Sequence, residues 1–167
     1  MGRALPAQPP SKFLLVMNSI VPEPAEAMFT IREIKGLQAM LDQFRLIRLL
    51  NPGMTAERYK ELLLQMLPNG YRMVGAFRND FCCGISGFWV NTKLYSGKYL
   101  EADNFVVEEA YRSKGVGKLL SDWMLQEAKD LNCDTVMLDA YVTNSAAHKF
   151  YFREGFYIKS YHFFKSL

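Results

Sequence analysis

The sequence is poor in cysteine and has no long apolar run. Three of its 167 residues are cysteines, and Cys82 and Cys83 are adjacent, so a disulfide scaffold is excluded and a reducing, cytoplasmic location is expected. No stretch approaches the ~20 apolar residues of a membrane-spanning helix, so we expect no membrane partner. No histidine or cysteine spacing is typical of a zinc site, so we expect no metal.

An excess of charge of one sign is also missing. The formal net charge is +3, and 22% of the residues are charged. The basic excess is spread over residues 28–97, whereas a nucleic-acid-binding domain normally concentrates basic residues in a stripe with aromatic residues between them. We therefore expect no nucleic acid partner, and the charge remains compatible with a small anionic ligand.

The length and composition predict one globular domain with an N-terminal extension. Five of the seven prolines lie within the first 24 residues, where no regular apolar spacing is present. We interpret residues 1–27 as a proline-rich extension outside the fold and residues 28–167 as the domain.

Apolar spacing within residues 28–167 predicts an α/β fold. The strands are expected at residues 29–34, 71–78, 81–91, 98–107, 135–141 and 156–164, and the helices at 37–50, 55–66, 116–131 and 145–154. This order predicts one domain built on a mixed sheet with helices on both of its faces.

A glycine-containing turn follows the strand that ends at Val107. Gly115 and Gly117 open an amphipathic helix, so backbone N–H groups and the positive end of the helix dipole can face an anion. Arg112 and Lys114 can add positive charge. The alternative is a tight turn without a ligand. A P-loop is excluded by Leu119 after the Gly-Lys pair, and a dinucleotide-binding fingerprint is excluded by Leu120.

This turn and a second motif resemble those of one enzyme family. Arg112-x-x-Gly115-x-Gly117 after a strand resembles the pyrophosphate signature of the GNAT superfamily of N-acetyltransferases. The segment from Asn144 through Phe150-Tyr151 to Gly155-Phe156 resembles that family's second signature. The resemblance extends from residue 28 to the C-terminus.

The resemblance implies acetyl-CoA as co-substrate and direct transfer, in a ternary complex, to a primary amine of a small molecule or protein. It also implies a slot between two splayed central strands, 100–107 and 135–141, with the pantetheine arm in the slot and the pyrophosphate at residues 112–117. The residues expected to bind the coenzyme are Phe105, Val106, Val107, Arg112, Ser113, Lys114, Gly115, Val116, Gly117, Lys118, Asn144 and Tyr151.

Amine attack on a thioester needs a base, because a lysine-like amine with a pKa near ~10.4 is mostly protonated at pH 7. Glu101 and Asp103 lie two apart on one strand and hence on one face. The resemblance allows a base at either position, and Glu101 is the first choice. The alternative for both is a solvated carboxylate, with His148 or a water chain as the base.

The resemblance implies that Tyr151 is the general acid for the coenzyme A thiolate, and the alternative is a core tyrosine. Two classes of function remain: the acetyltransferase, and a non-catalytic module that binds acyl-CoA as a sensor or scaffold. Retention of Tyr151 together with a strand carboxylate favours the enzyme. Exposed strand edges make a homodimer possible.

Overall fold

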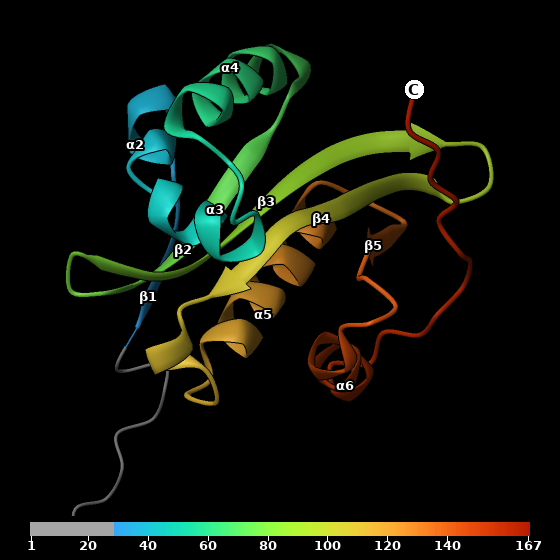
Figure 1. The fold of residues 1–167 in the computed structure, drawn as a ribbon. Coiled ribbons are helices and arrows are strands. Elements are labelled where there is room, and N and C mark those ends of the chain that lie inside the picture. The colour runs from blue at the N-terminus through green and yellow to red at the C-terminus, as the bar shows by residue number, and fades with distance from the viewer. Residues whose placement is uncertain (1–28) are drawn as a thin grey trace, which may run out of the picture.

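The computed structural model describes residues 29–167, so the expected extension over residues 1–27 lies outside the described part of the chain. The core of the fold is a five-stranded sheet in the order β1-β2-β3-β4-β5 (Figure 1). The strands are β1 (Thr30–Glu33), β2 (Arg72–Arg78), β3 (Phe81–Lys93), β4 (Gly97–Val107) and β5 (Thr135–Leu138). The first four pair antiparallel in sequence order, and β4 pairs with β5 in parallel.

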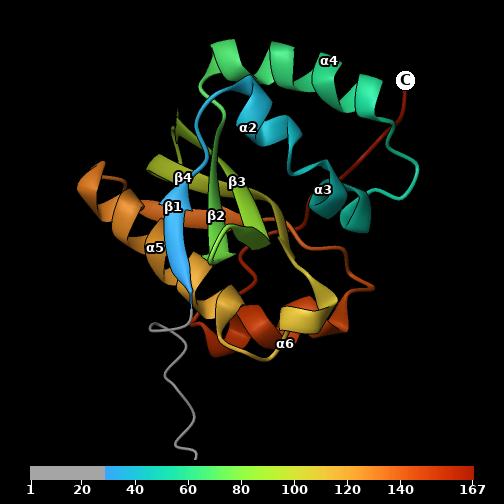
Figure 2. The same cartoon turned by 90° about the vertical axis from the view of Figure 1, so that its left-hand side faces the viewer.

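Helices cover both faces of the sheet, which confirms the predicted α/β class (Figures 1 and 2). One face carries α2 (Leu37–Leu41), α3 (Phe44–Leu50) and α4 (Ala56–Met66), and the other carries α5 (Val116–Asp130). The last helix, α6 (Ser145–Arg153), follows β5. None of the helices in residues 29–167 is long and apolar enough to cross a membrane.

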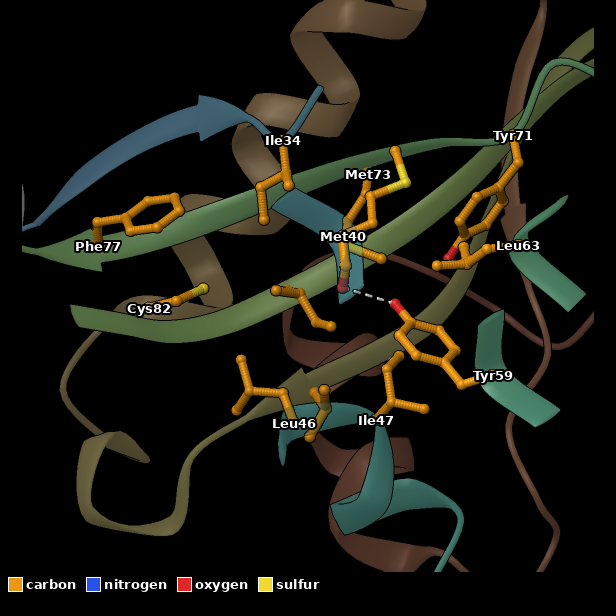
Figure 3. Packing of buried hydrophobic residues seen from close by; sticks show 12 residues of the cluster. Ile34, Met40, Leu46, Ile47, Tyr59, Leu63, Tyr71, Met73, Phe77 and Cys82 are labelled. Atoms are coloured by element: carbon orange, nitrogen blue, oxygen red, sulfur yellow. Dashed lines mark hydrogen bonds between the residues drawn. The ribbon is translucent and has the colours of Figure 1, made fainter. Parts of the chain in front are cut away.

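Each face of the sheet has its own apolar core. On the α2–α4 side, Leu46 and Leu63 are almost fully buried against Met73 of β2 (Figure 3). Tyr59 lies in this core and donates a hydrogen bond from its hydroxyl to the Met40 carbonyl, at 3.0 Å. On the α5 side, the core is formed by Val74, Cys83, Phe88, Leu100, Ala102, Val116, Leu120 and Met124, among others. The central part of the sheet is therefore buried on both faces.

Local signals in the sequence explain several element ends. Thr55 caps α4, because its hydroxyl accepts a hydrogen bond from the Arg58 amide at 3.1 Å. Asn79 has φ 55°, a left-handed conformation that asparagine tolerates in the tight turn between β2 and β3.

The predicted single helix over residues 37–50 is wrong. The chain turns at Asp42 and Gln43, which separate α2 from α3. Both residues make turn hydrogen bonds to the preceding helix, from the Asp42 amide to the Gln38 carbonyl and from the Gln43 amide to the Met40 carbonyl. The break lets Met40 of α2 and Leu46 of α3 enter the same core.

The predicted strand over residues 156–164 is also wrong, and β5 is shorter than the predicted 135–141. No residue after Arg153 belongs to a helix or strand of the described chain. The aromatic residues of the tail suit a strand, but a strand needs a buried face, and Tyr157, Tyr161 and Phe163 are 75%, 75% and 92% exposed. His162 Nδ1 lies 2.7 Å from Asp139 Oδ2, so a polar contact rather than a strand ladder links the tail to the end of β5.

The two central parallel strands separate, as the predicted slot requires. Strands β4 and β5 are paired from Tyr99, which lies opposite Thr135, to Ala102, which lies opposite Leu138, the last residue of β5. Strand β4 continues to Val107, so residues 103–107 have no strand partner on the β5 side. Their backbone groups on that edge can pair with an extended ligand.

Candidate active site

The free half of β4, residues 103–107, pairs with β3 but has no partner on the β5 side, and it begins with a β-bulge. Ile85 of β3 pairs with Val106, and Gly87 pairs with Asp103, so β4 has one residue more than β3 over this interval. Asn104 has φ 52°, the left-handed conformation of a bulged strand. The bulge changes the side-chain alternation of β4: Asp103 lies toward the α2–α4 side, whereas Phe105 packs against the α5-side core.

Asp103 lies in a partly buried aromatic setting. The Trp89 indole Nε1 donates a hydrogen bond to Asp103 Oδ2, at 3.4 Å. Burial raises the pKa of Asp103 above its ordinary value, and the nearby Asp139 carboxylate raises this pKa further. Hydrogen bonds from Trp89 and from the Asn104 backbone amide act in the opposite direction and lower the pKa. A carboxylate with a raised pKa in a sheltered position is a candidate base.

Glu101, the first choice from the sequence, has a different environment. Its carboxylate lies 3.8 Å from the Lys93 ammonium, and its side chain is partly exposed. Lys93 also lies over the Tyr99 ring, with its Nζ 4.4 Å from the centroid. The geometry thus gives Glu101 a cationic partner, while Asp103 has only neutral donors.

Tyr151 lies on α6 in an aromatic cluster that contacts the free half of β4. Its ring packs on Phe105 and Phe156, with centroid distances of 6.0 and 5.7 Å, and on Phe150 at 5.2 Å. Burial raises the pKa of Tyr151 to about 12, so its hydroxyl is protonated at neutral pH. Among residues 29–167, that hydroxyl makes no hydrogen bond and can donate its proton to a ligand.

The glycine-containing turn has the backbone that an anion site needs. Ser113 has φ 58°, and Gly115, which precedes the first residue of α5, has φ 86°. A non-glycine residue at positive φ is uncommon and often marks a functional turn. No side chain caps α5, so the amide N–H groups of Val116 and Gly117 are the donors that an anion at this terminus meets.

Gly117 also brings α5 and α6 together. A Cβ atom at this position would lie 3.2 Å from Phe150 Cε2 and 3.9 Å from Phe105 Cε1. This glycine therefore allows α6 to pack closely against the start of α5. Val116 is almost fully buried, so only its backbone can reach a ligand.

The charged side chains of the turn differ in their contacts. Arg112 Nε donates to the Val107 carbonyl at 3.3 Å, and Lys114 Nζ lies 5.5 Å from the Tyr111 ring centroid. Both side chains are exposed beside the turn. Lys118 is bound to Asp122 of the next helical turn, at 2.6 Å. Arg112 and Lys114 are thus better placed than Lys118 to meet a phosphate.

Asn144 has a clear structural role. Its Oδ1 accepts a hydrogen bond from the Ala147 amide at 3.1 Å and so caps α6. The cap fixes the start of the helix that holds Tyr151. His148 lies on the same helix and makes no side-chain hydrogen bond within residues 29–167. Within residues 29–167, no hydrogen bond joins the side chain of Asn144 or His148 to residues 103–107 of β4.

Tyr71 and Trp89 were not singled out from the sequence, but the structure places them beside Asp103. Their rings pack with centroids 5.1 Å apart. In the sequence, Gly87 is the residue that could have indicated this aromatic pair, because a glycine inside a strand often marks a bulge or a close contact.

In the described chain, no group of three or more histidine, cysteine or acidic residues could hold a metal. Burial raises the pKa of the Cys82 and Cys83 thiols, the opposite of an activated nucleophile.

Comparisons with known proteins identify the family. The model of the acetyltransferase (GNAT) family matches residues 38–156, which span both glycine motifs. A curated relative from Bacillus subtilis (strain 168), named uncharacterized N-acetyltransferase YhdJ, is 24% identical over 140 residues, which cover 83% of this chain and 99% of that protein.

Solved structures share the fold over a similar extent. A putative acetyltransferase from Agrobacterium tumefaciens str. C58 has a TM-score of 0.71 and 24% identity, covering 83% of this chain and 99% of that one. The aminoglycoside N-acetyltransferase AAC(6')-Iy, solved in complex with CoA, has a TM-score of 0.73 and 17% identity, covering 83% and 94%. Glucosamine-6-phosphate N-acetyltransferase from Arabidopsis thaliana has a TM-score of 0.61 and 21% identity, covering 83% and 97%. The chain belongs to the GNAT acetyltransferase family and is an acyltransferase.

Proposed function

We propose that this protein transfers the acetyl group of acetyl-CoA directly to a primary amine, with Asp103 as the base and Tyr151 as the acid. The observation that carries the proposal is the free half of β4, residues 103–107, which has Asp103 at its start and Phe105 in contact with the Tyr151 ring. The acceptor is a small-molecule or protein amine, as in the aminoglycoside and glucosamine-6-phosphate enzymes named above.

The described residues fit the coenzyme in three respects. The backbone of Phe105–Val107 offers an edge to which the pantetheine amides can bind. The start of α5 has no side-chain cap and offers N–H groups to the pyrophosphate. Gly115 has φ 86°, a backbone conformation that glycine adopts without steric strain because it has no Cβ atom. Arg112 and Lys114 supply positive charge beside that turn.

The base and the acid act on opposite sides of the thioester. Asp103 lies on the side of α2–α4, where a carboxylate can take a proton from the attacking amine, directly or through water. As the new C–N bond forms, the C–S bond breaks and its electron pair goes to the coenzyme sulfur. The Tyr151 hydroxyl gives its proton to that sulfur, and both residues then exchange protons with solvent.

The proposal is tested by measuring free coenzyme A thiol with a panel of amines. The panel contains sisomicin, glucosamine 6-phosphate and a lysine-containing peptide. We expect amine-dependent thiol release with at least one acceptor. We also expect acetyl-CoA at 100 times its Kd to stabilise the fold by about 2.7 kcal/mol, which raises Tm by roughly 5–10 °C for a chain of this size. A Tm shift without thiol release for any amine would contradict acetyl transfer.

Two lysines near opposite ends of α5 test the placement of the coenzyme. Lys114 precedes the N-terminus of the helix, and Lys129 lies in its last turn. Lys114→Ala should weaken acetyl-CoA binding by several-fold and more strongly at low salt, because it removes charge next to the pyrophosphate. Lys129→Ala should leave binding unchanged, and equal effects of the two substitutions would place the pyrophosphate elsewhere.

A homodimer remains a prediction, and the exposed aromatic residues of the C-terminal tail, residues 156–167, support it. Phe163 and Phe164 are 92% and 88% exposed, and the outer edge of β5 pairs with no strand of residues 29–167. Large exposed apolar groups and an open strand edge each favour association. Sedimentation equilibrium should give twice the monomer mass, and Phe163→Ser with Phe164→Ser should lower it. A monomeric wild-type protein at high micromolar concentration would contradict the prediction.

A further inference from the structure

The Asp103 carboxylate is held by an aromatic pair. Trp89 lies on β3, and its indole N–H reaches Asp103 Oδ2 on β4, at 3.4 Å. The Trp89 ring packs against Tyr71, with a centroid distance of 5.1 Å and an interplanar angle of 54°. Tyr71 is only 3% exposed and belongs to the core on the α2–α4 side (Figure 3).

The position of Tyr71 depends on Gly87. A Cβ atom at Gly87 would lie 1.9 Å from the Tyr71 hydroxyl oxygen and 2.7 Å from its Cε2. The tyrosine ring therefore lies directly over the glycine, and any side chain there would displace it. Gly87 is also the β3 residue opposite Asp103, at the edge of the bulge. The glycine, the tyrosine ring and the indole thus form one packed support for the carboxylate.

We propose that Trp89 is a positioning residue for acetyl transfer: its indole N–H orients Asp103, and Tyr71 over Gly87 holds the indole in place. The inference rests on the proposed function, in which Asp103 accepts a proton from the amine. A hydrogen bond to one carboxylate oxygen fixes the side-chain rotamer and leaves the other oxygen for the substrate. It also favours the ionised form, which is the form a base needs.

The other groups that act on Asp103 have defined effects. The Asn104 backbone amide favours the ionised form, and the Asp139 carboxylate opposes it. Burial opposes it as well and is the largest influence on the pKa of Asp103. Loss of the indole N–H removes one of the two groups that counter burial, so the pKa of Asp103 should rise further.

The test uses Trp89→Phe, which keeps an aromatic ring against Tyr71 and removes the N–H. With the best amine of the panel, the acidic limb of the kcat/KM profile should move to higher pH by roughly one unit. The rate should recover at high pH, where Asp103 is ionised in both proteins. A loss that is equal at every pH would indicate only a packing defect and would overturn the inference.

Trp123→Phe is the matched control, because Trp123 is the second of the two tryptophans and packs on Phe88 at the α5 side. The same substitution there should leave the pH profile unchanged. Because Trp123→Phe lacks one of the two indole N–H groups, its ¹H–¹⁵N spectrum also shows which indole signal belongs to Trp89. The Trp89 signal should move with pH as Asp103 titrates, and Asp103→Asn should abolish this movement.

A measurement that needs no acetyl transfer separates this inference from the proposed function. The ¹³C signal of the Asp103 carboxyl group reports its titration directly, and its midpoint should rise in Trp89→Phe. An unchanged midpoint overturns the positioning role and leaves acetyl transfer by Asp103 intact. Full activity of Asp103→Asn would instead refute Asp103 as the base, and the positioning role of Trp89 would fall with it.

Discussion

Asp103→Asn should lower kcat/KM at pH 7 by roughly 10²–10⁴-fold, the usual contribution of a general base. The amide has nearly the same shape as the carboxylate and can still accept the Trp89 N–H, but it cannot accept a proton from the amine. The loss should shrink as the pH approaches the amine pKa near ~10.4, because the acceptor then loses its proton unaided. A pH profile of kcat/KM, taken from initial rates at amine concentrations below KM, measures this loss.

The loss should not come from unfolding. Burial raises the pKa of Asp103, so the folded state binds this proton more tightly than the unfolded chain does. The contribution of Asp103 to stability is therefore most favourable below the ordinary aspartate pKa of ~3.9, and it is lost as the pH rises through the raised value. At pH 7 the ionised group costs stability, and Asp103→Asn should leave Tm unchanged or slightly higher.

Glu101→Gln is the matched control for this experiment. Glu101 lies on the same face of the same strand, two residues away, and it is paired with Lys93 at 3.8 Å. We expect a change of less than tenfold, with a similar pH profile. If Glu101→Gln loses more activity than Asp103→Asn, the base is Glu101, as the sequence suggested first. If neither substitution changes the rate at pH 7, the base is not a β4 carboxylate.

The sequence was sufficient for most of the fold because the strongest signals are local. The hairpin at Asn79, the cap at Thr55 and the glycine turn before α5 depend on residues within a few positions of each other. The tail shows the limit of such signals. Its aromatic residues are typical of a strand, but strand formation depends on a partner elsewhere in the sheet, and none pairs with it in residues 29–167.

The candidate site shows the same division between local and distant information. The turn proposed to bind the coenzyme lies in one short segment, so the sequence alone could predict it from its glycines. The choice between Glu101 and Asp103 could not be made from the sequence, because it depends on Trp89 and Lys93 of the neighbouring strand. The bulge at Asn104 adds a register change that strict alternation of strand side chains does not contain.

Tyr151→Phe should lower kcat by roughly tenfold to hundredfold while acetyl-CoA affinity changes little. Phenylalanine keeps the ring contacts with Phe105 and Phe156 and removes only the hydroxyl. Because burial raises the pKa of Tyr151 to about 12, the hydroxyl is protonated at neutral pH, as the proposed acid must be. A thiol pKa near ~8.5 makes coenzyme A a tolerable leaving group without help, so turnover should be slowed and not abolished.

Two comparisons distinguish proton donation by Tyr151 from a packing role. Tyr59→Phe removes another buried hydroxyl, which donates to the Met40 carbonyl at 3.0 Å, so it should lower Tm and leave kcat unchanged. Thioesters with a more acidic thiol should show a smaller loss in Tyr151→Phe, because a better leaving group needs less protonation. A loss confined to kcat marks an interaction made in the transition state. A variant with wild-type kcat, or one that loses only affinity, would show that Tyr151 forms the wall of the slot and is not the acid.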